Sequence, residues 1–190
     1  EGWKRFTERS ASDAMGGRNL LRPAVEVSVK RRDAQNTLHA LRAEYQRLDR
    51  VKDQPGGTQA YGNLEIIQQA FLDLGKAIHT YFTPEEKLGF QTFLQQIQPP
   101  FSPSEKETLA VQLAEPAGLS DLQEALRVSI VAAHAQRLTG NSDENESSYR
   151  QQRQQLFDFY RRRQAYEKAV ASLVLLWEQN PQRRRLFVDL

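Results

Sequence analysis

Apolar residues recur at intervals of three and four between Leu64 and Tyr81, and this spacing constrains the fold more than any other feature. The series is Leu64, Ile67, Phe71, Leu74, Ile78 and Tyr81. Because an α-helix has about 3.6 residues per turn, the series predicts one apolar stripe along about five turns of helix. Such a stripe has to pack against other elements, so the chain is expected to bury a core. Asn63, just before the series, is expected to cap this helix.

Two longer helices are predicted near the ends of the chain, over residues 24–52 and 147–179. Pro23 suits a first helical turn, and Asn180 with Pro181 closes the second helix. Their apolar series are Val27, Ala34, Leu38, Leu41, Tyr45 and Leu48, then Leu156, Phe159, Tyr166, Val170, Leu173 and Trp177. The alternation of Val25, Val27 and Val29 also suits a short strand, although a lone strand would have no partner.

Between these helices, the segment from residue 83 to residue 107 begins a helix, stops it and begins another. Thr83 and Ser102 are each followed by proline and, three residues on, by glutamate, which predicts two capping boxes. Pro99 and Pro100 stop the intervening helix because they lack amide donors. The two starts resemble a 19-residue repeat, but the apolar residues that flank them do not match well enough to predict a repeat array.

These patterns predict an all-α fold, an irregular bundle of about six helices in which the two long helices flank shorter ones. With 190 residues the chain fits one domain. We expect a loosely ordered arm over residues 1–22, a helical domain over 23–180 and a tail over 181–190.

Charge is unevenly distributed although the net charge is only +2. Residues 1–60 hold 12 lysines and arginines against 8 acidic residues, residues 61–126 hold 3 against 9, and residues 127–190 hold 11 against 7. This pattern is consistent with basic ends that fold against an acidic centre, and equally with a basic surface that the two ends form together.

Several kinds of catalytic site lack their usual residues. The chain has no cysteine, and its three histidines are far apart in sequence with no second ligand at the spacing that a helix requires for zinc. Phosphate-binding glycine loops and the GxSxG nucleophile motif are absent from the sequence. Glu85 and Glu86 are better explained by helix capping than by acid–base chemistry. We therefore predict no catalytic residues, metal or cofactor, and a protein that is not an enzyme.

Arginine clusters provide the candidate site. If the apolar series of the two long helices are extended, Arg31 and Arg163 are predicted to lie in their apolar stripes. A charged side chain in such a stripe has to reach solvent, pair with a carboxylate or meet a ligand. The sharper hypothesis is a basic face that holds nucleic-acid phosphates, with two tyrosines for stacking. Its residues are Lys30, Arg31, Arg32, Arg161, Arg162, Arg163, Tyr160 and Tyr166.

The C-terminal tail offers a second candidate. It joins an arginine cluster to the apolar residues Leu186, Phe187, Val188 and Leu190. These residues suit packing on the protein's own surface, and equally a short motif offered to a partner.

The function expected from these features is that of a non-enzymatic helical scaffold or assembly subunit that binds another protein or itself, either alone or as one domain of a larger chain. The alternative is a nucleic-acid-binding module that uses the arginine-rich ends, and an enzyme with scattered site residues is a third, weaker reading. The longest apolar run, residues 169–177, is much shorter than the roughly 20 residues of a membrane helix, so we expect a soluble protein without membrane partners. Residue types leave the compartment open, with a slight preference for the cytoplasm.

Overall fold

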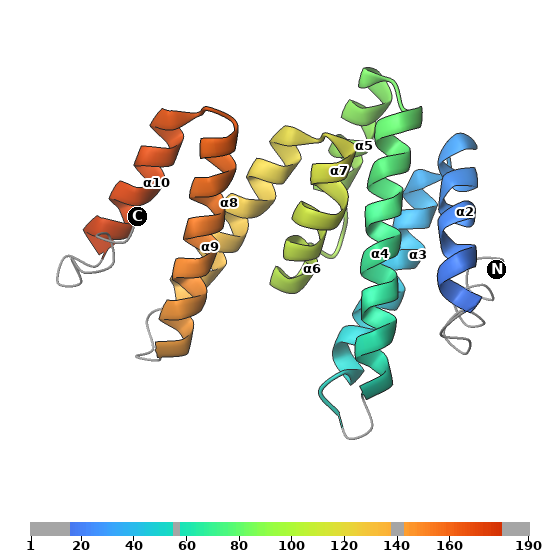
Figure 1. The fold of residues 1–190 in the computed structure, drawn as a ribbon, viewed down its shortest axis with the longest axis horizontal. Helices are drawn as coiled ribbons and strands as arrows, with labels where there is room; N and C mark the ends of the chain where they lie inside the picture. The colour runs from blue at the N-terminus through green and yellow to red at the C-terminus, as the bar shows by residue number, and fades with distance from the viewer. Residues whose placement is uncertain (1–15, 55–57, 138–142, 180–190) are drawn as a thin grey trace. The chain divides into compact units, whose positions relative to one another are not determined.

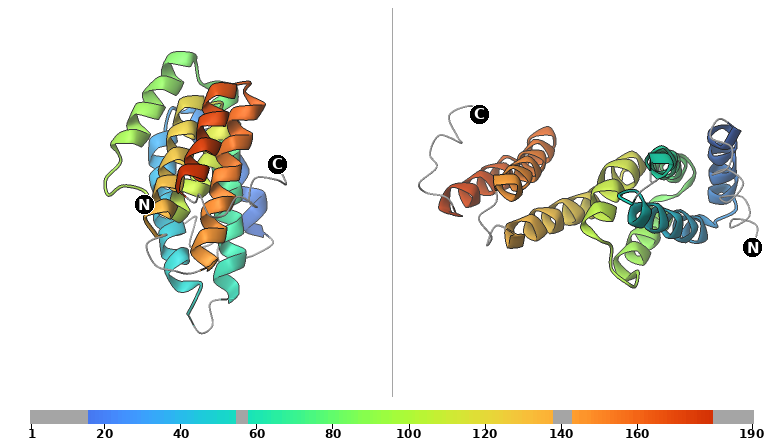
Figure 2. Two further views of the ribbon diagram at one scale, coloured as in Figure 1. Left: turned by 90° about the vertical axis from the view of Figure 1, so that its left-hand side faces the viewer. Right: turned by 90° about the horizontal axis from the view of Figure 1, so that it is seen from below.

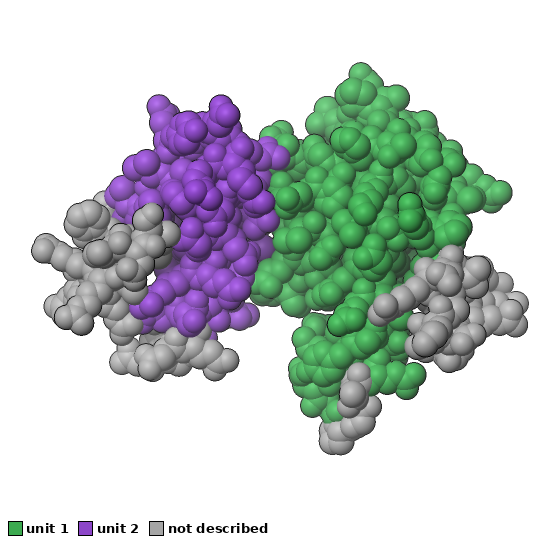
Figure 3. Space-filling model, in the orientation of Figure 1, with its two compact units in different colours: residues 1–123 green, residues 124–190 purple. Residues whose placement is uncertain are grey.

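The computed structural model describes residues 16–54, 58–137 and 143–179 (Figure 1). All secondary structure in these ranges is helical, which confirms the predicted all-α class. The described ranges contain more helices than the expected six, mainly because both long helices are divided. The chain forms two compact units, unit 1 over residues 1–123 and unit 2 over residues 124–190 (Figure 3).

Unit 1 is built around α4 (Thr58–Tyr81), which carries the apolar series described above. It packs against α2 (Gly16–Lys30), α3 (Ala34–Val51) and the η1–α7 segment (Leu109–Ala117), as Figures 1 and 2 show. The interior contains fully buried aliphatic residues, including Val25, Val29, Leu38, Leu41, Leu48, Leu74, Ile78 and Leu113, and the buried rings of Tyr45 and Phe71. The helix begins at Thr58, so Asn63 lies inside it and the cap predicted there is wrong.

The long helix predicted over residues 24–52 is divided into α2 and α3 by a turn at Arg32. Arg32 has a positive φ of 62°. Its N–H donates a hydrogen bond to the Val29 carbonyl, and the Asp33 N–H donates one to the Ser28 carbonyl. This pair of hydrogen bonds is a Schellman motif, which ends a helix in the left-handed conformation. This turn is hard to predict from the sequence because glycine usually occupies the left-handed position. An arginine in that conformation costs about 1 kcal/mol of conformational free energy.

The strand alternative for Val25, Val27 and Val29 is also wrong, because all three lie in α2. Helical geometry places Val25 and Val29 on one side, where both are fully buried, whereas Val27 is exposed. The helix begins at Gly16, so the last part of the expected N-terminal arm is helical.

The two capping boxes are present as predicted. Thr83 caps α5 (Pro84–Gln96) and Ser102 caps α6 (Pro103–Thr108), and in each case the glutamate at the third position returns a hydrogen bond to the cap amide. From α6 the chain continues through the π-helical segment η1 (Leu109–Ala114) into α7 (Glu115–Ala117). Gly118, at φ 73°, then ends this stretch with a second Schellman motif.

A buried arginine holds the corner between α5 and α6. Arg42 of α3 is 6 % exposed, and its Nε donates to Oε1 of Glu105 at 3.0 Å. Its Nη2 donates to the carbonyls of Pro99 and Pro100, and its guanidinium lies over the Phe101 ring. Because Glu105 also completes the α6 capping box, one ion pair joins α3 to both the corner and the next helix.

Unit 2 contains most of α8 (Ser120–Gln136), from Glu124 onward, together with α9 (Asp143–Arg162) and α10 (Tyr166–Gln179). Its core is formed by Val131 of α8, by Ala169 of α10, and by four residues of α9: Tyr149, Leu156, Phe159 and Tyr160. Helices α9 and α10 form a hairpin, which Figure 1 shows at the C-terminal end of the ribbon.

The second predicted long helix, residues 147–179, is divided in the same way as the first. Gln164 has a φ of 59°. Its N–H donates a hydrogen bond to the Arg161 carbonyl, and the Ala165 N–H donates one to the Tyr160 carbonyl. The turn changes the register, so Tyr166 and Val170 are exposed instead of continuing the α9 seam. Between residues 166 and 174, where burial is described, Ala169 and Ser172 are buried in their place.

Candidate binding groove in unit 2

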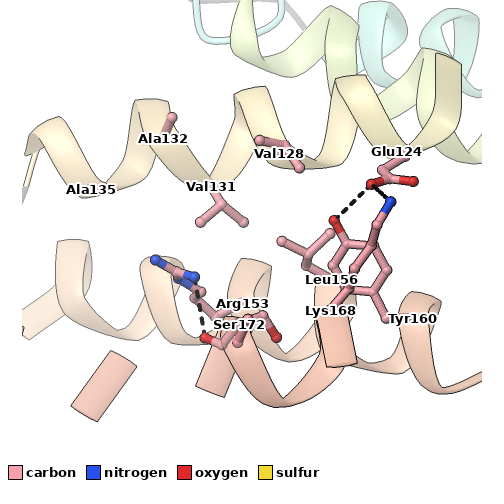
Figure 4. Close-up of a pocket in the computed structure, with 11 residues that line it drawn as sticks. Glu124, Val128, Val131, Ala132, Ala135, Arg153, Leu156, Tyr160, Lys168 and Ser172 are labelled. Atoms are coloured by element: carbon pink, nitrogen blue, oxygen red, sulfur yellow. Dashed lines mark hydrogen bonds and ion pairs between the residues drawn. The ribbon is translucent and has the colours of Figure 1, made fainter. Parts of the chain in front are cut away.

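A groove of about 530 Å³ lies between the three helices of unit 2 (Figure 4). Its lining comes from all three helices: Glu124, Val128, Val131, Ala132 and Ala135 of α8, Arg153, Leu156 and Tyr160 of α9, and Lys168, Ala171 and Ser172 of α10. Most of these side chains are apolar and several are alanines, whose short side chains leave space between the helices. The volume lies within the range of about 300–1,000 Å³ that is usual for small-molecule sites.

One end of the groove carries a neutralised set of polar groups. Lys168 Nζ donates to Oε1 of Glu124 at 2.7 Å, and the Tyr160 hydroxyl donates to the same oxygen at 3.1 Å. The hydrogen bond from Lys168 is the main reason that the pKa of Glu124 is lowered. Burial, together with the Glu124 charge, raises the pKa of Tyr160 to about 12. Tyr160 therefore remains a protonated donor at neutral pH.

The other end of the groove carries Arg153, which is 7 % exposed. Its Nε donates to the Tyr149 hydroxyl at 2.9 Å, its Nη1 donates to the Ser172 carbonyl at 3.2 Å, and its guanidinium lies 5.3 Å from the Tyr149 ring centroid. Figure 4 shows Arg153 well separated from the Glu124 and Lys168 end. The two ends therefore differ: one holds an ion pair and the other holds a buried cation.

The residues predicted for a basic face fall into both units. Lys30, Arg31 and Arg32 belong to unit 1, and Arg161, Arg162 and Arg163 belong to unit 2. All six side chains are exposed, so the prediction that Arg31 and Arg163 lie in apolar stripes is wrong. The reason is that each cluster lies at or just beyond a helix end, where the apolar register stops.

The first cluster is bound to neighbours within unit 1. Lys30 pairs with Glu26 at 2.7 Å and lies over the Tyr81 ring. Arg32 pairs with Glu86 at 2.6 Å, which connects the α2–α3 turn to α5.

The second cluster surrounds the α9–α10 turn. Arg161 pairs with Asp158 at 3.4 Å, Arg162 donates to the Asp158 carbonyl, and Arg163 lies 4.6 Å from the Phe159 ring centroid. Tyr166, three residues after Arg163, is 62 % exposed.

Tyr160 cannot play the stacking role predicted for it. It is 6 % exposed and belongs to the unit 2 core, with its ring centroid 5.4 Å from that of Phe159. The apolar tail residues Leu186, Phe187, Val188 and Leu190 lie outside the described residues.

Three charged groove residues were not among the predicted site residues: Glu124, Arg153 and Lys168. Of these, only Arg153 could have been found from its spacing in the sequence. It lies four residues after Tyr149 and three before Leu156, so it continues the α9 core series toward the N-terminus. Arg163 has the same spacing after Phe159, but α9 ends at Arg162, so Arg163 lies outside the helix.

Two features are absent from the described part of the chain. No cluster of three histidine, cysteine or acidic side chains is placed there to hold a metal ion. None of the helices described combines the length and the apolar character that crossing a membrane requires. In the comparisons with known proteins, no family model, curated protein or solved structure matches the chain.

Proposed function

We propose that the chain is a non-enzymatic interaction protein that binds another protein, or a second copy of itself, through an apolar stripe on α10. The stripe consists of Tyr166, Val170 and Val174, which are 62 %, 56 % and 43 % exposed. Their spacing of four residues puts them on one side of the helix.

The stripe is the observation that supports this proposal. Single apolar residues are common on protein surfaces, but a continuous apolar row on one helix is typical of helices that pack against a partner. The absence of nucleotide-loop and nucleophile motifs from the sequence is consistent with a binding role rather than a catalytic one.

The proposal predicts that charges in the stripe abolish association. A Val170→Lys/Val174→Lys variant is expected to weaken self-association, measured by sedimentation equilibrium, at least tenfold, because it would place two charges in an apolar interface. Binding to a different protein is measured by photo-crosslinking from position 170 in an extract of the source cells.

Glu167→Lys is the matched control, because Glu167 is an exposed residue of the same helix outside the stripe. It is expected to leave association unchanged. A chain that stays monomeric at all concentrations, and that crosslinks no more from position 170 than from position 167, would contradict the proposal.

Nucleic-acid binding is a second candidate, favoured by the exposed groups at the α9–α10 turn. Arg161, Arg162 and Arg163 lie there beside the exposed ring of Tyr166. The Arg161–Asp158 pair is exposed and contributes little, so its arginine is available to exchange this partner for a phosphate.

If this second function holds, an Arg161→Glu/Arg162→Glu variant is expected to lose binding to labelled single-stranded RNA or DNA. The measurement is fluorescence anisotropy at about 50 and 200 mM salt, a range over which phosphate contacts weaken strongly. Arg47→Glu is a control with the same type of charge change on an exposed arginine of unit 1. If the unaltered chain does not bind nucleic acid, or if both variants weaken binding equally, the α9–α10 turn is excluded as the site.

A further inference from the structure

Arg153 differs from the other buried arginine described above in having no carboxylate partner. Arg42 is buried to a similar extent and is neutralised by Glu105 at 3.0 Å. Arg153 bonds only to a tyrosine hydroxyl and a backbone carbonyl, and among the described residues no acidic side chain forms an ion pair with it. A guanidinium is charged at all ordinary pH values, and burying a charge without a counter-ion is costly.

The donor capacity of Arg153 is also only partly used. Nε and Nη1 have the partners given above, whereas Nη2 makes no hydrogen bond to any residue in the described ranges. A planar guanidinium with free donors is suited to a carboxylate, which accepts hydrogen bonds from two adjacent nitrogens.

The groove extends from this cation along an apolar surface. Val131 points into it from α8 in Figure 4, and Ala132, Leu156 and Ala171 line it as well. At the far end the Glu124 carboxylate is already bonded to Lys168 and Tyr160, so the groove has only one end that lacks a counter-ion.

From this arrangement we propose that the groove binds a small anionic amphiphile, an aliphatic carboxylate whose head group pairs with Arg153. The carboxylate accepts hydrogen bonds from the guanidinium, and the alkyl chain covers Val131, Ala132 and Leu156. This arrangement supplies the missing counter-ion and removes apolar surface from water, which favours binding. The site does not depend on the α10 stripe, because its α10 residues are Lys168, Ala171 and Ser172.

The test uses dodecanoate as the probe and isothermal titration calorimetry on the full chain, below the micelle concentration. Dodecanoate is expected to bind one-to-one, and dodecyltrimethylammonium, with the same alkyl chain and the opposite charge, at least tenfold more weakly. Arg153→Met keeps much of the side-chain volume and is expected to lower dodecanoate affinity about 10- to 100-fold, which is the effect of losing a hydrogen bond to a charged group.

Arg150→Met is the matched control. Arg150 lies one turn earlier on α9, pairs with Glu146 at 2.6 Å and does not line the groove. A second variant, Ala132→Trp, fills the groove while leaving Arg153 in place, so it tests the site even if Arg153→Met disturbs the fold. It is expected to reduce dodecanoate binding at least tenfold.

Three results would overturn the proposal: no binding of dodecanoate by the unaltered chain, equal affinity for the two amphiphiles, or equal effects of Arg153→Met and Arg150→Met. The Val170→Lys/Val174→Lys variant is expected to bind dodecanoate normally. Failure of the stripe proposal and failure of the groove proposal are therefore separate results.

Discussion

Replacing Arg42 with methionine is expected to destabilise unit 1 by about 3–5 kcal/mol, the cost of leaving one partner of a buried ion pair without the other. Glu105 is 4 % exposed and would lose its ion-pair partner, keeping only hydrogen bonds from the Gln46 amide and the Ser102 N–H. The carbonyls of Pro99 and Pro100 would lose their donor as well. Because the chain has two units, urea unfolding is best followed by amide hydrogen exchange of peptides from α3 and α6, which reports on unit 1 alone.

Arg47→Met provides the control on the same helix. Arg47 is exposed and pairs with Glu44 at 2.6 Å, so its loss is expected to cost about 0.5 kcal/mol or less. The double variant Arg42→Met/Glu105→Leu is expected to recover part of the loss, because it buries no charge. Recovery is incomplete because Glu105 also caps α6. Equal costs for Arg42→Met and Arg47→Met would show that the buried pair has no special role.

Gly75→Ala is expected to destabilise unit 1 by about 1–3 kcal/mol, although alanine is the better helix former. A Cβ at position 75 would lie 2.6 Å from the Leu113 backbone oxygen and 3.1 Å from Cβ of Pro116. Backbone cannot rotate away as a side chain can, so α4 would have to move from the η1–α7 segment. Thermal and urea unfolding, again with hydrogen exchange on α4 and η1, measure the effect.

Gly62→Ala tests the same substitution on the same helix without the contact. A Cβ at Gly62 would meet nothing within 4 Å, so the higher helix propensity of alanine is expected to stabilise α4 by about 0.5–1 kcal/mol. The two glycines are thus expected to give effects of opposite sign. A stabilising effect of Gly75→Ala would contradict the explanation that close packing of α4 against η1 requires glycine at this position.

Features set by neighbouring residues were predictable from the sequence, and those set by distant contacts were not. The caps at Thr83 and Ser102 need only residues within three positions, and both are present. The turns at Arg32 and Gln164 have neither glycine nor proline, so the apolar spacing continued across them and suggested single long helices. What ends these helices is the packing of the following helix, which sequence spacing does not reveal.

The candidate sites show the same limit. Arg42 follows Leu38 by four residues and precedes Tyr45 by three, so its core position was visible in the spacing. Its partner Glu105, however, is 63 residues away in sequence. Likewise, no local pattern predicts the hydrogen bond from the buried Tyr160 hydroxyl to Glu124. The same is true of the hydrogen bond from Arg153 to the Ser172 carbonyl across the hairpin.

The short turn between α9 and α10 also determines which wall of the groove is held most firmly. Only residues 163–165 separate the two helices, so bringing them together costs little chain entropy. The connection from α8 to α9, residues 137–142, is twice as long in sequence, and closing a longer connection costs more chain entropy. Two walls of the groove therefore belong to one tightly connected hairpin, whereas the α8 wall is joined to it through a connection twice as long.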